Sequence, residues 1–152
     1  MSIRPLAPAD VPALAASLAT LPLLVRYGRT ADAQARDWHE ALTRGDTLLV
    51  HDDGSGPAGL AWFVPGGTLA VGGYLRLIAV RPDAQRRGIG AALLAAFEAG
   101  VRATSRHAFL LVSDFNTEAQ RFYKRHGYGR VGVLPGLVRP DVGEVLFWKT
   151  LR

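Results

Sequence analysis

The chain has 152 residues, 49% of them apolar, and 18 Lys and Arg against 13 Asp and Glu give a formal net charge of +5. This length suits one domain with a sizeable core, and we expect residues 1–152 to form that single domain. No run reaches the ~20 apolar residues that span a bilayer, and the first residues lack the apolar segment of a signal peptide. The absence of cysteine excludes disulfides, thiolate nucleophiles and cysteine metal sites. We therefore expect a cytoplasmic protein with no metal site and no membrane partner.

The positive charge comes mostly from arginine. An anionic partner such as nucleic acid would explain it. The basic residues are nevertheless scattered, except at Arg86-Arg87 and between Arg121 and Arg130. A composition rich in Ala, Gly and Arg explains the charge more simply, so we do not expect nucleic acid to be the partner.

Turn and capping residues divide the first half of the chain into short elements. We expect a strand at 3–6, a helix at 11–18 with Asp10 as its N-cap, and an irregular apolar link at 20–28. A second helix, capped by Thr30 or Asp32, runs to about Arg44 and ends at Gly45-Asp46. A strand at 47–51, a hairpin turn at 52–57 and a partner strand at 59–64 follow.

The second half alternates strands and helices. After a turn at Pro65-Gly66-Gly67 we expect a long strand at 69–80, interrupted at 72–73, and then a helix from Ala91 to Arg102. A buried strand at 107–112, a helix from Asn116 to Gly127 and strands at 128–134 and 144–151 complete the chain. Hairpins imply antiparallel pairing, and the strand–helix–strand unit implies one parallel pair. We predict an α+β fold with a mixed, mostly antiparallel sheet of about seven strands flanked by about four helices.

The most informative segment is Gln85-Arg86-Arg87-Gly88-Ile89-Gly90-Ala91, between an apolar strand and an alanine-rich helix. Glycines at this junction let a phosphate approach the backbone, and the first helical turn offers unpaired N–H groups at the positive end of the helix dipole. The two arginines add positive charge. The alternative is a strand-to-helix turn whose glycines only relieve steric crowding.

A second motif, Asn116-Thr117-Glu118-Ala119-Gln120-Arg121-Phe122-Tyr123-Lys124-Arg125-His126-Gly127-Tyr128, lies downstream. Together the two motifs and the order of elements resemble the GNAT superfamily of acyl-CoA-dependent N-acyltransferases. The first motif matches the family's cofactor signature Q/R-x-x-G-x-G/A, and the second matches its Asn, Phe-Tyr and Gly-Tyr pattern. The resemblance covers almost the whole chain, is strongest from Leu75 to Tyr128, and implies a single-domain GNAT-like fold.

The resemblance implies a cofactor site for acetyl-CoA. The pantetheine arm would pair with the backbone of the strand before the glycine turn, and the diphosphate would lie on the amides of that turn. Asn116, which also suits a helix N-cap, would contact the pantetheine amides. The implied cofactor-binding residues are Ile78, Ala79, Val80, Arg86, Arg87, Gly88, Ile89, Gly90, Ala91 and Asn116.

The resemblance also implies the reaction: transfer of an acetyl group to a primary amine by direct attack on the thioester. Tyr123 matches the family's general acid, whose phenol protonates the departing thiolate. Its alternative is a core-facing aromatic on an amphipathic helix. The acceptor would be a small-molecule or peptide amine, and the last two strands are candidates for a homodimer contact. A non-catalytic acyl-CoA-binding module, acting as a sensor or scaffold, is the alternative function.

The general base is left unassigned by the sequence. The positions where many relatives carry a glutamate correspond to Tyr74 and Leu111, so the usual carboxylates are absent. The remaining candidates are His39 or Glu40 on the second helix, Asp114 after the fifth strand and Glu144 on the last strand.

The acceptor site would be formed by residues 20–44 and 135–143. Arg139 and Asp141 could recognise a charged acceptor. For Trp38 and Trp62 we expect buried packing rather than a place in the acceptor groove.

Overall fold

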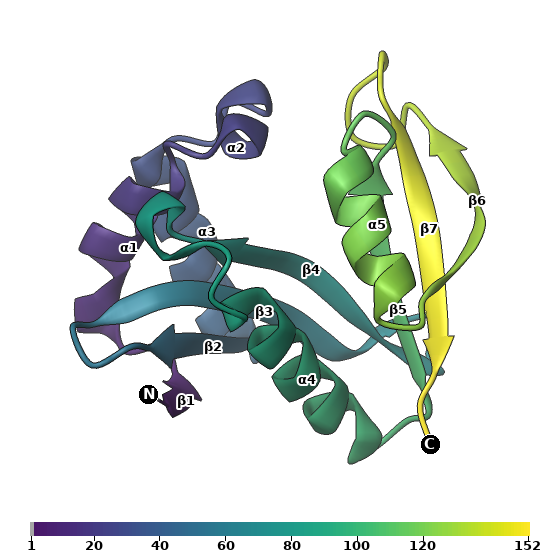
Figure 1. Cartoon of the computed structure of the whole chain (residues 1–152), viewed down its shortest axis with the longest axis horizontal. Coiled ribbons are helices and arrows are strands. Elements are labelled where there is room, and N and C mark those ends of the chain that lie inside the picture. Colours follow the sequence, from purple (N-terminus) through teal and green to yellow (C-terminus); the bar gives the residue numbers. More distant parts are fainter. Residues whose placement is uncertain (1) are drawn as a thin grey trace.

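The computed structural model describes residues 2–152 and contains one seven-stranded sheet in the order β1-β2-β3-β4-β5-β7-β6 (Figure 1). Its strands are β1 (Ser2–Pro5), β2 (Thr47–Asp52), β3 (Pro57–Thr68), β4 (Gly72–Val80), β5 (His107–Ser113), β6 (Gly129–Pro135) and β7 (Gly143–Thr150). Its α-helices are α1 (Val11–Leu18), α2 (Pro22–Arg26), α3 (Ala31–Arg44), α4 (Ile89–Arg102) and α5 (Thr117–Arg125). All pairs are antiparallel except β4 with β5. The predicted α+β class and mixed sheet are confirmed.

Local capping agrees with the sequence at α3 and differs at α1. Thr30 caps α3 by accepting a hydrogen bond from the Ala33 amide at 3.1 Å, and Gly45 ends the helix with a left-handed φ of 91°. Asp10 precedes α1, but its carboxylate accepts from the Ala7 amide at 2.8 Å and so caps a preceding 3₁₀ turn instead. The apolar link that we expected to be irregular contains the short helix α2.

The hairpin between β3 and β4 turns later than the sequence predicts. The turn expected at Pro65-Gly66-Gly67 is wrong: β3 continues to Thr68, and the chain reverses at Leu69 and Ala70, which have φ values of 52° and 58°. The Pro-Gly-Gly residues fall in an irregular stretch of the ladder, between the pairs Val64↔Tyr74 and Thr68↔Gly72. They interrupt the pairing without reversing the chain, so β4 begins at Gly72 rather than at Leu69.

The parallel pair β4 and β5 is short, and this shortness opens the sheet. Only the residues from Gly73 to Leu75 pair with β5, ending at Leu75↔Leu110. On the other side of β4 the register with β3 shifts at Arg76, which has no partner there. A bulge bends the strand away from its neighbour. Beyond Arg76, β4 therefore pairs with β3 alone, and a gap opens between β4 and β5.

Helices cover both faces of the sheet and create its cores. On one face, α1 and α3 bury Leu14, Leu18 and Trp38 against β2 and β3. On the other face, α4 buries Phe97 against Phe63, with ring centroids 5.2 Å apart, and α5 packs over β5 and β7 (Figure 1). Among residues 2–152, every helix is too short or too polar to cross a lipid bilayer. The gap between β4 and β5 thus lies between two well-packed halves.

Candidate active site

Two cavities meet in the gap between β4 and β5. The larger measures about 800 Å³ and extends from the glycine turn before α4 to α5. The smaller, of about 170 Å³, lies between α2, β4, β5 and β7. The residues lining both are Leu23, Ile78, Asn116, Ala119 and Tyr123. A molecule entering from the glycine turn can therefore reach the smaller cavity.

The glycine turn has the geometry of an anion cradle. Gly88 is the N-cap of α4 with a left-handed φ of 78°, and a Cβ placed on it would have no atom within 4 Å. The first intrahelical hydrogen bond of α4 runs from the Ala92 amide to the Gly88 carbonyl at 3.0 Å, so the amides of residues 89–91 precede it. Such amides are free donors at the positive end of a helix. The turn lines the larger cavity and fits a diphosphate.

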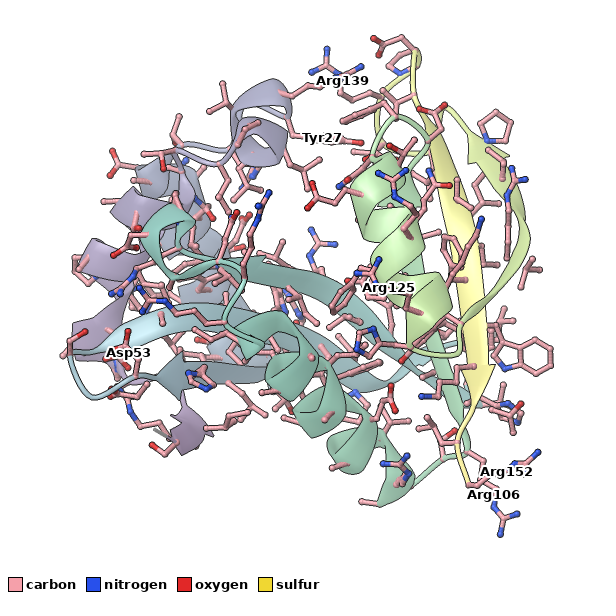
Figure 2. All side chains as sticks on the ribbon, in the orientation of Figure 1. Tyr27, Asp53, Arg106, Arg125, Arg139 and Arg152 are labelled. Atoms are coloured by element: carbon pink, nitrogen blue, oxygen red, sulfur yellow. The ribbon has the colours of Figure 1, made fainter. Side chains whose placement is uncertain are left out.

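The arginines around this cradle differ from the sequence prediction. Arg86 lines the larger cavity, whereas the Arg87 side chain does not and donates instead to the Asp83 carbonyl at 3.1 Å. Arg26 and Arg125 also line the cavity, although the sequence did not single them out there. The only sequence signal for Arg125, labelled on α5 in Figure 2, was the cluster of basic residues around it.

The exposed edge of β4 forms one wall of the larger cavity. Ile78, Ala79 and Val80 all line it. Because β5 has diverged, the backbone groups of these residues on that edge have no strand partner. An extended ligand with amide groups can therefore pair with β4 as an added strand.

Asn116 serves two purposes at the start of α5. Its Oδ1 accepts a hydrogen bond from the Ala119 amide at 3.2 Å, so it is the N-cap of the helix. Within residues 2–152 its amide nitrogen has no hydrogen-bond partner, and Asn116 lines both cavities. The side chain can therefore cap the helix through oxygen and donate to a ligand through nitrogen.

Tyr123 lies further along α5, where the two cavities join. Its partly buried ring packs edge-to-face against Phe122 and Tyr128, with centroids 5.1 Å and 5.8 Å away. Desolvation raises the pKa of the Tyr123 phenol well above its ordinary value. The phenol is protonated at neutral pH, as an ordinary tyrosine is.

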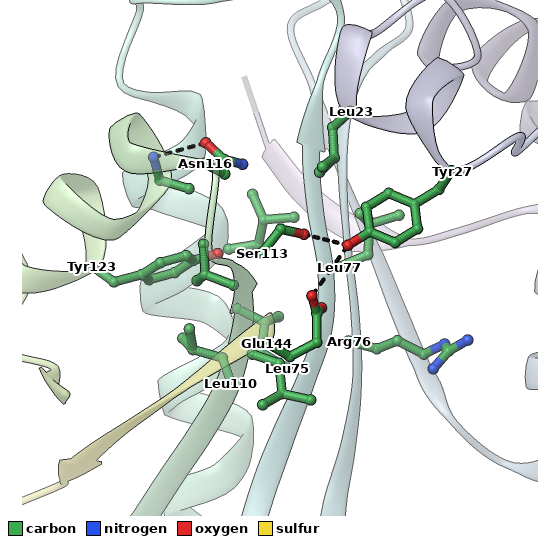
Figure 3. A pocket seen from close by; sticks show the side chains of 14 residues that line it. Leu23, Tyr27, Leu75, Arg76, Leu77, Leu110, Ser113, Asn116, Tyr123 and Glu144 are labelled. Carbon is green, nitrogen blue, oxygen red and sulfur yellow. Dashed lines mark hydrogen bonds between the residues drawn. The ribbon is translucent and has the colours of Figure 1, made fainter. Parts of the chain in front are cut away.

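The smaller cavity contains a carboxylate, that of Glu144 of β7, a residue that is only 7% exposed. The Tyr27 hydroxyl donates to Glu144 Oε2 at 3.1 Å and is itself hydrogen-bonded to the Ser113 hydroxyl at 2.5 Å (Figure 3). Ser113 and Glu144 are paired residues of β5 and β7. Figure 3 shows the Tyr123 hydroxyl on the opposite side of this cluster, directed toward it.

Contacts from α2 close the outer side of this cluster. The Arg26 guanidinium lies 3.4 Å from the centroid of the Phe115 ring, and Arg139 donates to the Arg26 carbonyl at 2.9 Å. In Figure 2, Tyr27 and Arg139 lie near one another at the top of the molecule. The C-terminal end of α2 is thus held to the loop between β6 and β7.

The residues that the sequence offers as a general base differ in where they lie relative to the cavities. Glu144 lies in the smaller cavity, whereas His39 and Glu40 are exposed on α3 and line neither cavity. Asp114 is also exposed and accepts from the Gly143 amide at 2.9 Å. Leu111 lines the smaller cavity and Tyr74 lies outside it. Trp38 and Trp62 are buried at 1% and 5% exposure, as expected.

Sequence reasoning missed Ser113, and it placed Tyr27 in the acceptor segment 20–44 without assigning it a role. Tyr27 falls in the link expected to be irregular, and Ser113 ends a strand that otherwise reads as apolar. One signal could have identified Ser113. Side chains alternate along a strand, so Ser113 lies on the same face of β5 as Leu111, which the resemblance had already placed at the site.

Comparison with known proteins gives the family. Residues 44–130 match the family model described as an acetyltransferase (GNAT) domain. That match covers more than half of the chain and contains both the glycine turn and Tyr123. The chain belongs to the GNAT family of acetyltransferases. It matches none of the curated proteins with which it was compared.

Solved structures with the same fold come from several organisms. A GNAT-family protein from Desulfovibrio desulfuricans has 24% identity and a TM-score of 0.81, covering 99% of both chains. An acetyltransferase from Thermus thermophilus has 23% identity and a TM-score of 0.82, covering 99% of this chain and 96% of the other. An aminoglycoside 6'-N-acetyltransferase complexed with coenzyme A has 20% identity and a TM-score of 0.77, covering 99% of this chain and 97% of the other. At these identities the likeness establishes the fold.

Proposed function

We propose that the chain, folded as one domain, is an N-acetyltransferase that transfers an acetyl group from acetyl-CoA to the primary amine of a small molecule or peptide. The observation that carries the proposal is the meeting of two cavities at Tyr123. One cavity has an anion cradle and a strand edge with no neighbouring strand, and the other contains a buried carboxylate. A donor and an acceptor can therefore enter from different sides and meet beside a proton donor.

The chain offers suitable groups for each part of the donor. The amides from Arg86 to Ala91 would hold the diphosphate, with the Arg86 side chain adding charge. The backbone of Ile78, Ala79 and Val80 would pair with the pantetheine arm, and the Asn116 amide would donate to it. Arg87 would contribute only through its backbone. Acetyl-CoA supplies the acetyl group as a thioester.

Two further groups would assist the transfer. A free N–H of β4 beyond the Arg76 bulge would stabilise charge on the thioester oxygen. The Tyr123 hydroxyl, which is protonated at neutral pH, would give its proton to the leaving sulfur.

The test begins with calorimetric titration of the intact protein with acetyl-CoA and with CoA. Saturable binding is expected for both. An amine panel is then assayed for thiol release. Binding without release with any amine would favour the alternative, a non-catalytic acyl-CoA sensor or scaffold. No binding by folded protein would overturn the donor site itself.

A further inference from the structure

The smaller cavity contains a buried charge that the other residues do not neutralise. Among residues 2–152, Glu144 forms no ion pair within 4.0 Å, although it is 7% exposed. Its recorded hydrogen bond comes from the neutral Tyr27 hydroxyl. The nearby Arg76 guanidinium lies instead over the Trp62 ring, 4.7 Å from its centroid. A buried carboxylate is stabilised by a cation, so this position favours a positively charged ligand.

The directions of the Tyr27 and Ser113 hydrogen bonds leave the Glu144 carboxylate able to accept further hydrogen bonds. The single proton of Tyr27 is donated to Glu144, so the Ser113 hydroxyl must donate to the Tyr27 oxygen. From residues 2–152 the carboxylate thus receives one hydrogen bond, on Oε2, and none on Oε1. A carboxylate accepts several hydrogen bonds, which leaves room for an ammonium group.

The walls of the cavity restrict the rest of the ligand. They include the aliphatic side chains of Leu77, Leu110 and Leu111. The volume of about 170 Å³ is close to that of apolar cavities that hold one benzene molecule, so a short alkyl chain fits beside the carboxylate.

We propose that Glu144 binds the acceptor as a primary alkylammonium and removes its proton for the transfer. This rests on the proposed function. Glu144 takes one proton from the ammonium, and the free nitrogen bonds to the acetyl carbon as the carbon–sulfur bond breaks. Tyr123 gives its proton to sulfur and regains one from the new amide nitrogen. The net products are the N-alkylacetamide, the free thiol and one proton, which leaves Glu144 for solvent.

Binding is tested without any transfer, by titrating the intact protein with n-butylammonium chloride and following its backbone amide NMR signals. A matched probe is 1-butanol, which has the same alkyl chain and lacks the charge. We expect saturable shifts at Ser113 and Val145 with n-butylammonium and at least about tenfold weaker binding of 1-butanol. Equal binding of the alcohol, or no binding of n-butylammonium, would overturn the proposal.

Substitutions at Glu144 and Glu40 test whether the Glu144 carboxylate is the group that binds n-butylammonium. Glu144→Gln removes the charge at nearly constant size and should weaken n-butylammonium binding at least about tenfold. Glu40→Gln, at an exposed position of α3, should leave this binding unchanged. Glu144→Asp keeps the charge and should preserve the preference for the ammonium over the alcohol, which guards against a folding defect in Glu144→Gln. Unchanged binding in Glu144→Gln, or loss of the preference in folded Glu144→Asp, would contradict the assignment.

Transfer assays separate this inference from the proposed function. In Glu144→Gln, thiol release should fall at least about tenfold while calorimetric binding of acetyl-CoA stays as in the wild type. Normal turnover in Glu144→Gln would overturn the role of Glu144 and leave the acetyltransferase function standing. Wild-type protein that binds n-butylammonium but transfers to no amine would contradict the function and leave the ammonium site standing.

Discussion

Tyr27 and Glu144 are 117 residues apart in the chain, yet the Tyr27 hydroxyl donates a hydrogen bond of 3.1 Å to the Glu144 carboxylate. This bond joins the segment after α2 to the start of β7 across the opening between β4 and β5. The Tyr27 ring also stacks on Phe115, with centroids 6.3 Å apart. The position of α2 therefore determines both the shape of the smaller cavity and the environment of its carboxylate.

Removing the Tyr123 hydroxyl should affect the reaction and not the binding of the donor. In Tyr123→Phe we expect kcat to fall about 100-fold, because the leaving thiolate loses its proton donor. The ring still packs against Phe122 and Tyr128, so the structure is kept. Steady-state thiol release and calorimetric binding of acetyl-CoA measure the two effects separately. Unchanged kcat would remove Tyr123 from the role of acid.

The cradle is tested by a side chain that fills it. Gly88→Glu should weaken acetyl-CoA binding at least about 100-fold, because it places a bulky negative group where the diphosphate is expected. It also introduces strain, since Gly88 has a φ of 78°. The matched control is Gly45→Glu: Gly45 has a φ of 91°, no atom within 4 Å of its Cβ position, and lines neither cavity.

Both substitutions should cost about 1–2 kcal/mol of stability from the left-handed backbone. Only Gly88→Glu should lose binding in the calorimeter. Equal loss in the two variants would mean that strain, rather than the cradle, is responsible.

The close approach of α4 to β4 depends on Gly73. A Cβ at this position would lie 2.2 Å from Val101 Cγ2, and Val101 is fully buried. Gly73→Ala should therefore lower the free energy of unfolding by about 1–3 kcal/mol through overpacking. Gly66→Ala, where a Cβ meets nothing within 4 Å, should change it by less than about 0.5 kcal/mol. Urea denaturation measures both, and equal effects would contradict the packing argument.

Stability at low pH should depend on Arg4. It donates to Asp10 at 2.7 Å and to Asp52 at 3.1 Å, and the pKa of Asp10 is lowered chiefly by this hydrogen bond. A carboxylate whose folded pKa is lowered stabilises the protein above its unfolded pKa of about 3.9 and loses this contribution as the pH falls through the folded value.

Arg4→Met should consequently have a lower melting temperature than the wild type at pH 7, and the difference should shrink as the pH falls below about 4. The measurement is a series of thermal melts of both proteins at pH values from 7 to below about 4. A difference that stays constant or grows on acidification would show that the ion pair is not its source.

Local rules were sufficient for most of the secondary structure. The cap at Thr30, the stop at Gly45 and the glycine turn before α4 each depend on a few neighbouring residues, and all appear where expected. The β3–β4 hairpin shows where such rules fail. Pro65, Gly66 and Gly67 are typical of a turn, but pairing of the two strands on both sides of them continues the hairpin to Leu69 and Ala70. The pairing of β3 with β4 therefore outweighed the turn preference of these three residues.

By itself, the sequence determined the family's two motifs, and with them the glycine turn before α4 and the placement of Tyr123 on α5, because each motif is a continuous segment with its own local geometry. The sequence could not decide which of His39, Glu40, Asp114 and Glu144 is best placed to act as the general base. That choice depends on which residues face the gap, and the gap exists because β4 bends away from β5 at Arg76. Only the tertiary structure brings Tyr27, Ser113 and Glu144 together, since they come from three distant segments whose contact is fixed by sheet order and register.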